Sequence, residues 1–311
     1  MNLCYGSIIP YDRWFVKRIV LFDTAGNLCY NRRRTRGNED TAMFTKNDIF
    51  KQLETLGVPR NRPVTIHTSL RNIGEVEGRG EGLLDALIEY VTPDGGLLCV
   101  PTHTHGNLYN DKIITLDFLH LNTNIGTFPR IAIEDGRGVH SVNPSHSMTI
   151  FGDRAQAERF AAYDETILTC TSPEGCYGRL AAEDGYVLLA GVGQDKNTYL
   201  HCVEEMLHLP DRMTRGYVDT TIRYPDGHIE HFPLRTYIAW MTALGDTSHR
   251  FPYYEPAFRY HGCIRDGKLG NADTQLCSAR GMAEVAKRIY DRSGGVDFLG
   301  EDREIPEEVY R

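Results

Sequence analysis

Long apolar runs are missing from this sequence. None reaches the roughly 18 residues that a membrane-spanning helix requires. The apolar stretch at residues 14–22 (WFVKRIVLF) is short, carries two cations and is followed by polar residues rather than by a small-residue cleavage site. It therefore does not have the features of a signal peptide. We expect a cytoplasmic protein with no membrane partner.

An excess of positive charge is also missing. The formal net charge is −8, whereas non-specific binding to nucleic acid requires a basic surface. The sequence therefore predicts no nucleic-acid partner. The negative net charge weakly favours a cationic ligand, because an acidic cleft raises the local concentration of positive molecules. The alternative is that the acidic charge serves only solubility.

The eight cysteines include no C-x-x-C pair. The spacing of a zinc ribbon is therefore absent, and a chain of 311 residues does not need a disulfide framework. We expect reduced thiols and no bound metal.

Residues 1–42 differ from the rest of the chain. A basic cluster at residues 32–36 lies among polar residues without a clear periodicity, and regular patterning starts near Met43. We interpret residues 1–42 as an N-terminal extension outside the core fold and residues 43–311 as a single domain. The alternative is an N-terminal arm that packs on this domain.

From Met43 onward, segments with helical and strand patterns alternate. Thr45 and Asp48 can form a capping box for a helix that ends at Gly57. Residues 77–82 (EGRGEG) predict a loop, and residues 218–235 predict a β-hairpin with its turn at residues 225–227. Alternating strands and helices indicate a three-layer α/β/α arrangement, and the hairpin suggests a mixed sheet. Further strands are expected at residues 63–67, 97–100 and 185–191, and further helices at residues 83–91, 198–209 and 281–290.

Polar residues follow two of the predicted strands directly. Residues 67–74 (HTSLRNIG) follow the first strand, and residues 101–105 (PTHTH) follow the second. Ligands bind beyond the carboxyl ends of strands in open α/β sheets, and backbone N–H groups there suit phosphate or pantetheine. The H-x-H pair His103 and His105 can also bind a metal. The alternative is two ordinary polar loops.

Two further segments place imidazoles near polar partners. Residues 143–147 (NPSHS) form a predicted turn before an apolar run. After the strand at residues 185–191, Thr198 can cap a helix on which His201 and Glu204 lie three residues apart and face the same side. A carboxylate that orients an imidazole and raises its basicity suits general-base catalysis. The alternative is a solvated helix face.

Taken together and in order, these segments resemble the aminoglycoside 3-N-acetyltransferase family, also called the antibiotic N-acetyltransferases. The resemblance covers most of residues 43–290. It is looser at Gly262 and at residues 268–272, which are similar to a G-x-x-G-x-A segment. The segments that carry it are His67 to Gly74, Leu97 to Thr102, Gly126 to Ser147, Ser172 to Leu180 and Leu188 to Glu204.

The resemblance implies an acetyltransferase domain that moves an acetyl group from acetyl-CoA to the 3-amino group of the 2-deoxystreptamine ring of an aminoglycoside. It implies a monomer or homodimer without a metal, with His201 as the base and Glu204 as its partner. The implied CoA-binding residues are His67, Thr68, Ser69, Leu70, Ile73, Gly74, Pro101, Thr102 and His103. We expect Asn143, in a supporting role, and His146 to contribute to substrate binding, and we expect the carboxylates of Asp195 and Glu205 to read the ammonium groups of the substrate.

The chain departs from the family pattern at two places. Asn143 stands where relatives usually have histidine, and residues 130–134 (RIAIE) stand where relatives tend to have an acidic residue and a Phe-Arg pair. These changes concern the amine more than CoA. The alternatives are therefore acylation of another amine or use of another acyl-CoA, a non-catalytic CoA-binding protein, and a metal-dependent hydrolase. The hydrolase would use His67, His103, His105 and His201.

Overall fold

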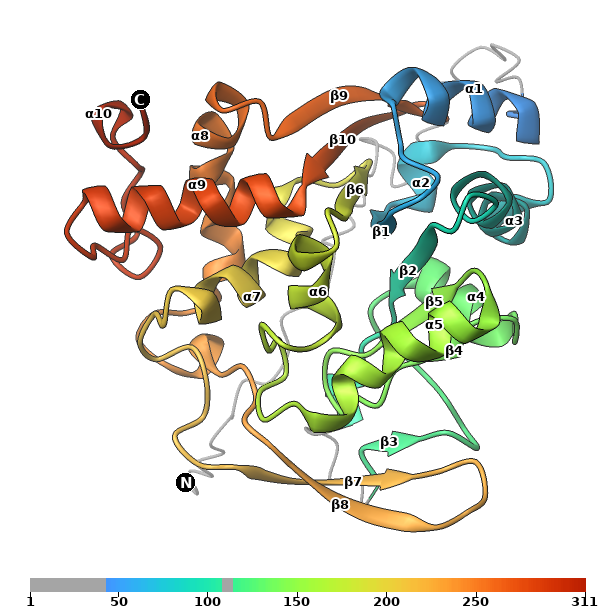
Figure 1. Cartoon of the computed structure of the whole chain (residues 1–311), viewed down its shortest axis with the longest axis horizontal. Coiled ribbons are helices and arrows are strands. Elements are labelled where there is room, and N and C mark those ends of the chain that lie inside the picture. Colours follow the sequence, from blue (N-terminus) through green and yellow to red (C-terminus); the bar gives the residue numbers. More distant parts are fainter. Residues whose placement is uncertain (1–42, 108–113) are drawn as a thin grey trace, which may run out of the picture. The chain divides into compact units, whose positions relative to one another are not determined.

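The computed structural model describes residues 43–107 and 114–311; the interpretation of residues 1–42 lies outside them. Its largest sheet has seven strands in the order β4-β5-β2-β1-β6-β10-β9 (Figure 1). The three strands β2, β1 and β6 run parallel, and the outer strands pair antiparallel. The strands are β1 (Pro63–Thr68), β2 (Leu97–Pro101), β4 (Val139–His140), β5 (Met148–Phe151), β6 (Tyr186–Ala190), β9 (Ile264–Leu269) and β10 (Ala272–Ser278).

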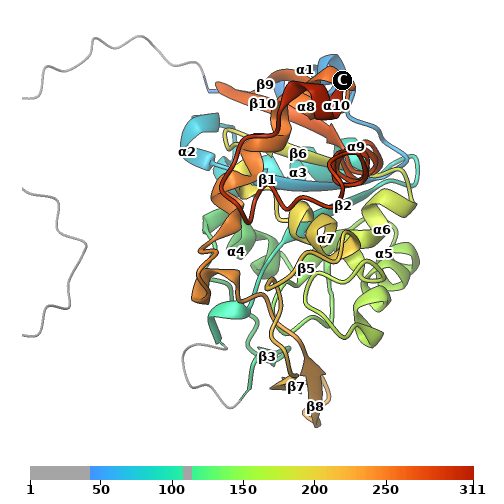
Figure 2. The same ribbon diagram turned by 90° about the vertical axis from the view of Figure 1, so that its left-hand side faces the viewer.

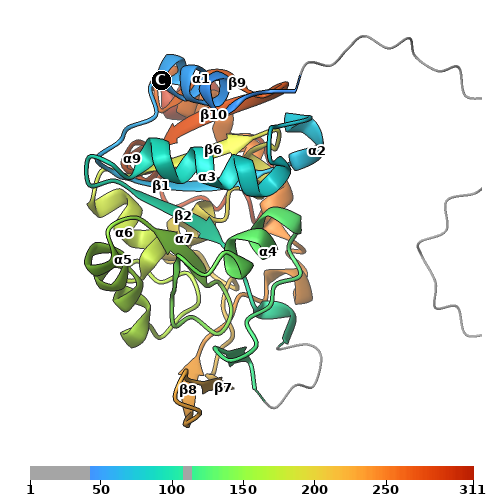
Figure 3. The same cartoon turned by 90° about the vertical axis from the view of Figure 1, so that its right-hand side faces the viewer.

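Helices cover both faces of this sheet because its central strands are apolar on both sides. Successive strand residues point to opposite faces. Leu98 belongs to the core under α1 (Lys46–Leu56), α3 (Arg79–Val91) and α4 (Thr127–Glu134), which cover the near side in Figure 3. Its neighbour Cys99 belongs to the core on the other face. The helices there are α5 (Arg154–Ala161), α6 (Cys176–Ala182), α7 (Tyr199–Met206), α8 (Glu255–Tyr260) and α9 (Ala279–Arg292). The predicted three-layer arrangement is confirmed.

The predicted start of the first helix is confirmed, but that of the second is wrong. Thr45 and Asp48 form the capping box of α1, and Gly57 ends the helix with a φ of 74°. Residues 79–82, expected in a loop, are the first turn of α3. A Cβ atom on Gly82 would lie 1.9 Å from the carbonyl oxygen of Glu77. Gly82 is therefore needed because the carbonyl group of Glu77 lies close to the backbone of the first helical turn, and it does not mark a loop.

The predicted β-hairpin forms, but it does not belong to the main sheet. Strands β7 (Val218–Arg223) and β8 (Ile229–Leu234) pair with each other, and β7 also pairs with β3 (Leu116–Asp117), in a separate three-stranded sheet. This sheet lies away from the main one in both Figure 1 and Figure 2. Leu234 is the only residue of β8 that is buried, and a strand in a covered sheet needs two apolar faces. The main sheet is mixed because of its own outer strands.

The helix that carries His201 begins without the expected cap. Thr198 has helical φ and ψ angles, and its side chain makes no capping hydrogen bond to α7. A short 3-10 segment (Gln194–Lys196) precedes the helix and leads the chain into it. The capping prediction is therefore wrong, although the helix forms where expected. The other short segments are α2 (Leu70–Ile73), α10 (Glu307–Tyr310) and the 3-10 turns His105–Asn107, Ala162–Thr166, Ala239–Met241 and Thr247–Tyr254.

Within the ranges that the structure describes, no helix combines the length and apolarity needed to cross a membrane.

Candidate active site

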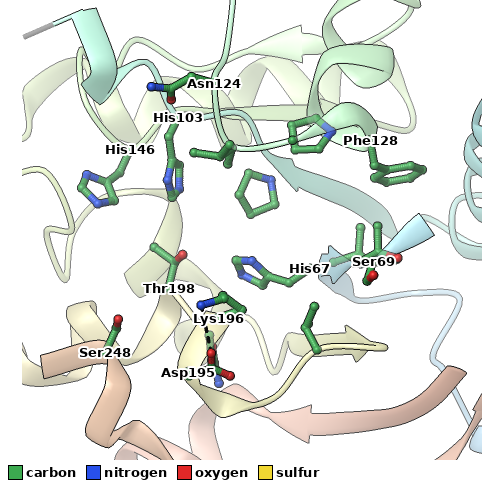
Figure 4. A pocket seen from close by; sticks show the side chains of 18 of the residues that line it. His67, Ser69, His103, Asn124, Phe128, His146, Asp195, Lys196, Thr198 and Ser248 are labelled. Atoms are coloured by element: carbon green, nitrogen blue, oxygen red, sulfur yellow. Dashed lines mark ion pairs between the residues drawn. The ribbon is translucent and has the colours of Figure 1, made fainter. Parts of the chain in front are cut away.

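A cleft of about 970 Å³ opens beyond the carboxyl ends of the parallel strands. The residues that follow β1, β2 and β6 line it, as expected for a ligand site in an α/β sheet. Figure 4 shows the side chains of these three strand ends around one opening. The sequence-derived candidates that line the cleft are His67, Thr68, Ser69, Leu70, Pro101, His103, His146, Asp195 and His201.

His201 and Glu204 form a buried imidazole–carboxylate pair on α7. Nδ1 of His201 lies 2.9 Å from Oε2 of Glu204, and the two residues are 9% and 2% exposed. The rings of Tyr237 and Phe251 pack against the imidazole, with centroid distances of 4.2 and 4.8 Å. Since a carboxylate only accepts hydrogen bonds, Nδ1 donates a proton to Glu204, and in the neutral ring Nε2 is then left as an acceptor. This arrangement suits a general base.

The second oxygen of Glu204 is held as firmly as the first. Oε1 accepts hydrogen bonds from Nε of Arg212 and from the hydroxyl of Thr247, the latter at 2.9 Å. Burial opposes the charge of Glu204, but the hydrogen bond and charge of His201 and the charge of Arg212 outweigh it, and the pKa of Glu204 is lowered. The carboxylate is therefore ionised and fixed in place beneath His201.

Three more histidines stand beside this pair. The ring of His146 lies 4.6 Å from that of His103, 5.8 Å from that of His105 and 6.4 Å from that of His201, between centroids. Nε2 of His103 also lies 2.8 Å from the hydroxyl of Tyr177. Burial lowers the pKa of His103, His105 and His146, and mutual repulsion adds to the effect for His103 and His146. These imidazoles are therefore neutral hydrogen-bonding groups at neutral pH.

Asn143 shapes the turn that delivers His146 to the cleft. Its Oδ1 atom accepts hydrogen bonds from the backbone N–H groups of Ser145 and His146 at 3.1 and 2.8 Å. Its amide nitrogen donates to the carbonyl oxygen of Cys170 at 2.9 Å. Asn143 is 1% exposed and does not line the cleft. The residue that departs from the family pattern therefore supports the site from behind.

Among the described residues that line the cleft, four carry formal charge: Arg71, Asp195, Lys196 and Asp246. Nζ of Lys196 pairs with Oδ2 of Asp195 at 2.9 Å (Figure 4). Burial disfavours the charge of Asp246, but hydrogen bonds from Ser248 and the nearby His201 prevail and lower its pKa. Asp246 is thus an ionised carboxylate in the cleft, and no lysine or arginine of the described ranges lies within salt-bridge distance of it.

Several candidates from the sequence lie outside the lining of the cleft. Ile73 is fully buried in the core, and Thr102 is buried against Thr149, with 3.2 Å between their hydroxyl oxygens. Glu205 accepts hydrogen bonds from the hydroxyls of Thr169 and Thr171, both at 2.5 Å, and burial raises its pKa. Hydrogen bonds therefore hold the Glu205 carboxylate outside the cleft. The candidates outside the lining are Ile73, Gly74, Thr102, Asn143, Glu204 and Glu205.

Sequence reasoning missed several residues that complete the site. Tyr237, Asp246 and Phe251 come from the segments after β8, and no motif connects them with α7. Phe128 is different, because the segment 126–129 (GTFP) carries part of the family resemblance and could have been assigned to the cleft.

Within residues 43–107 and 114–311, no three His, Cys, Asp or Glu side chains are arranged to hold a metal ion. The histidines of the cleft pack against one another and against tyrosine and serine groups rather than converging on one point.

Fold and site define an α/β protein with an imidazole–carboxylate pair in a cleft at the carboxyl ends of three parallel strands. Residues 65–291 match the family model described as aminoglycoside 3-N-acetyltransferase. The chain belongs to this family of acyltransferases.

Curated relatives agree with this assignment. The chain is 28% identical over 173 residues to aminoglycoside N(3)-acetyltransferase IV of a Salmonella species, in a match that covers 54% of this chain and 61% of that protein. It is 25% identical over 256 residues to aminoglycoside N(3)-acetyltransferase III of Pseudomonas aeruginosa, covering 75% and 88%. The match thus spans about three fifths of the length of the first relative.

Solved structures show the same fold. A mutant of aminoglycoside acetyltransferase AAC(3)-IVa in complex with a gentamicin aligns with a TM-score of 0.67 at 24% identity, covering 81% of this chain and 90% of that one. The binary complex of AAC-IIIb with CoASH aligns with a TM-score of 0.67 at 19% identity, covering 86% and 100%.

Proposed function

We propose that this protein transfers an acetyl group from acetyl-CoA to the 3-amino group of the 2-deoxystreptamine ring of an aminoglycoside. The observation that carries the proposal is the buried pair of His201 and Glu204, whose imidazole lines a cleft of about 970 Å³ at the strand ends. Family membership and the gentamicin-bound and CoA-bound structural neighbours support the choice of substrates.

The residues of the cleft suit CoA at the end formed by β1 and α4. Leu70, Pro101 and Phe128 supply apolar surface for a pantetheine arm. His67 lines the cleft, and its buried Nε2 atom has no hydrogen-bond partner among the described residues. This atom can therefore form a hydrogen bond with an amide of the pantetheine arm. Arg71 supplies a cation for a phosphate. Donor and acceptor would then meet beside His201.

The acceptor amine must be neutral to attack the carbonyl carbon of the thioester. Nε2 of His201 accepts the proton that the nitrogen loses as the C–N bond forms, and Glu204 stabilises the resulting imidazolium. The C–S bond breaks, and the CoA sulfur leaves as a thiolate that takes up this proton from the imidazolium, which restores the neutral base. Tyr237 and Phe251 pack against the imidazole and shield it from water.

A less highly charged amine is a second candidate acceptor. A polycationic aminoglycoside calls for several carboxylates, whereas the described lining offers Asp195, already paired with Lys196, and Asp246. The neutral imidazoles of His103, His105 and His146 instead suit hydroxyl and amide groups.

The test is acetyl-CoA turnover against a panel of amines, with released CoA measured by a thiol reagent and the product located by NMR. The panel contains gentamicin, an analogue with a hydroxyl group in place of the 3-amino group, and small monoamines. Acetylation of gentamicin at N3, with no turnover of the analogue, supports the proposal. Turnover of monoamines alone overturns the aminoglycoside assignment in favour of the second candidate. Release of CoA with no amine contradicts both.

A further inference from the structure

Arg212 is buried directly behind the proposed catalytic pair. It is 1% exposed, and its Nε atom donates to Oε1 of Glu204. Its Nη2 atom donates to both oxygens of Asp297 at 2.9 and 2.8 Å, and Nη1 donates to the carbonyl oxygen of Pro210 at 2.9 Å. The side chains of His201, Glu204, Arg212 and Asp297 thus form one continuous chain of hydrogen bonds. Arg212 lies in the loop that follows α7, and Asp297 lies in the loop that follows α9.

The charges along this chain alternate. With a neutral imidazole, the carboxylates of Glu204 and Asp297 and the guanidinium of Arg212 sum to one negative charge. Arg212 alone would cancel the charge of Glu204 and weaken its support for an imidazolium. Asp297 restores that negative charge, so protonation of His201 brings the group to neutrality. In a buried environment, where charges interact strongly, this compensation matters more than it would in water.

We propose that Arg212 and Asp297 are positioning residues: Arg212 holds the Glu204 carboxylate against His201, and Asp297 offsets the charge of Arg212 so that Glu204 still favours a protonated imidazole. Their role in acetyl transfer rests on the proposed function, whereas their effect on the protonation of His201 does not depend on any substrate.

The other groups that face His201 leave this assignment in place. His103 and His146 are neutral, because burial lowers their pKa values. Tyr237 is neutral as well, because burial raises its pKa. Asp246 also acts on His201, but its carboxylate is 43% exposed and is screened by water. Phe251 and Thr198 carry no charge, and Asp195 and Lys196 neutralise each other.

The decisive experiment is an NMR titration of the His201 ring in the full chain without substrates. We expect Asp297→Asn to lower the pKa of His201 by about one pH unit. The substitution removes one negative charge that is separated from His201 by the side chains of Glu204 and Arg212. Asp302→Asn is the matched control: it makes the same charge change in the same loop at an exposed residue that pairs with Arg250. The control should leave the titration unchanged.

Arg212→Lys supplies a second readout. Lysine keeps the charge but cannot hold Glu204 and Asp297 in the planar fork of a guanidinium. We expect the titration of His201 to stay near that of the wild type, while kcat falls about 10- to 100-fold through misplacement of Glu204 and the KM for acetyl-CoA is unchanged.

A folded Asp297→Asn protein with an unchanged His201 titration overturns the proposal, even if its melting temperature falls, since that pattern describes a purely structural ion pair. If Asp297→Asn does not fold, Arg212→Lys decides, and an unchanged kcat overturns the proposal. A wild-type protein that acetylates no amine would sink the proposed function instead and leave the titration result standing.

Discussion

Nδ1 of His201 lies 2.9 Å from Oε2 of Glu204, three residues further along the same helix. Residues at this spacing are neighbours on a helix surface, so the helix by itself brings the two side chains within reach of each other. What the rest of the chain supplies is burial, a cleft in front of the imidazole, and Arg212 and Thr247 behind the carboxylate.

His201→Ala should lower kcat by a factor of about 10² to 10⁴, the usual contribution of a general base. The dissociation constant of CoA, measured by isothermal titration calorimetry, should change little, because the residues proposed to bind CoA lie at the other strand ends. His231→Ala serves as the control, since His231 is exposed on β8. A His201→Ala enzyme with normal kcat would remove His201 from the mechanism.

Asp246→Asn should raise the KM for a cationic acceptor about fivefold at low ionic strength, in line with a partly solvated ion pair. The KM of the wild-type enzyme should rise with salt through screening, and that of the variant should respond less. Steady-state kinetics at several salt concentrations measure both effects. Asp219→Asn, an equal charge change at an exposed residue of β7, is the control. Equal salt dependence in variant and wild type would exclude Asp246 from acceptor binding.

His140→Gln should flatten the pH dependence of stability. His140 is buried, and burial lowers its pKa to about 3. Between about pH 6.5 and 3 the unfolded chain binds a proton at this residue and the folded chain does not. The stability linked to neutral His140 is thus complete above pH 6.5 and is lost as the pH falls, by up to about 1.4 kcal/mol per pH unit.

Urea denaturation at pH 7, 6 and 5 measures this slope in the wild type and in His140→Gln. The control is His231→Gln, which alters an exposed imidazole on β8. If His140→Gln and the wild type lose stability in parallel over this range, then burial of His140 is not the source of the acid sensitivity.

Asn143→Ala should reduce the free energy of unfolding by about 2 kcal/mol, because it leaves buried backbone groups without hydrogen-bond partners. It should also lower activity, since Asn143 sets the turn that places His146 in the cleft. Chemical denaturation and steady-state kinetics check the two effects. Thr55→Ala, at an exposed position of α1, should change stability by less than about 0.5 kcal/mol. Full activity in Asn143→Ala would show that the turn tolerates the loss.

Two predictions differ from the structure because contacts between residues far apart in the chain decide them. The hairpin at residues 218–235 forms as predicted, but the strand that it pairs with lies about a hundred residues earlier, and local patterning contains no record of that partner. Glu205 was predicted to bind the substrate, but it does not line the cleft. Neighbours on a helix point in different directions, and Thr169 and Thr171 hold Glu205 elsewhere.

By itself, the sequence determined what short-range geometry controls. The capping box of α1, the strand ends that carry His67 and His103, and the helical spacing of His201 and Glu204 all follow from residues close together in the chain. The tertiary structure alone decided which distant groups complete the site: Tyr237 and Asp246 around the imidazole, and Arg212 and Asp297 behind the carboxylate. The physical reason is that such contacts come from packing elements remote in sequence, and no local preference of the backbone encodes them.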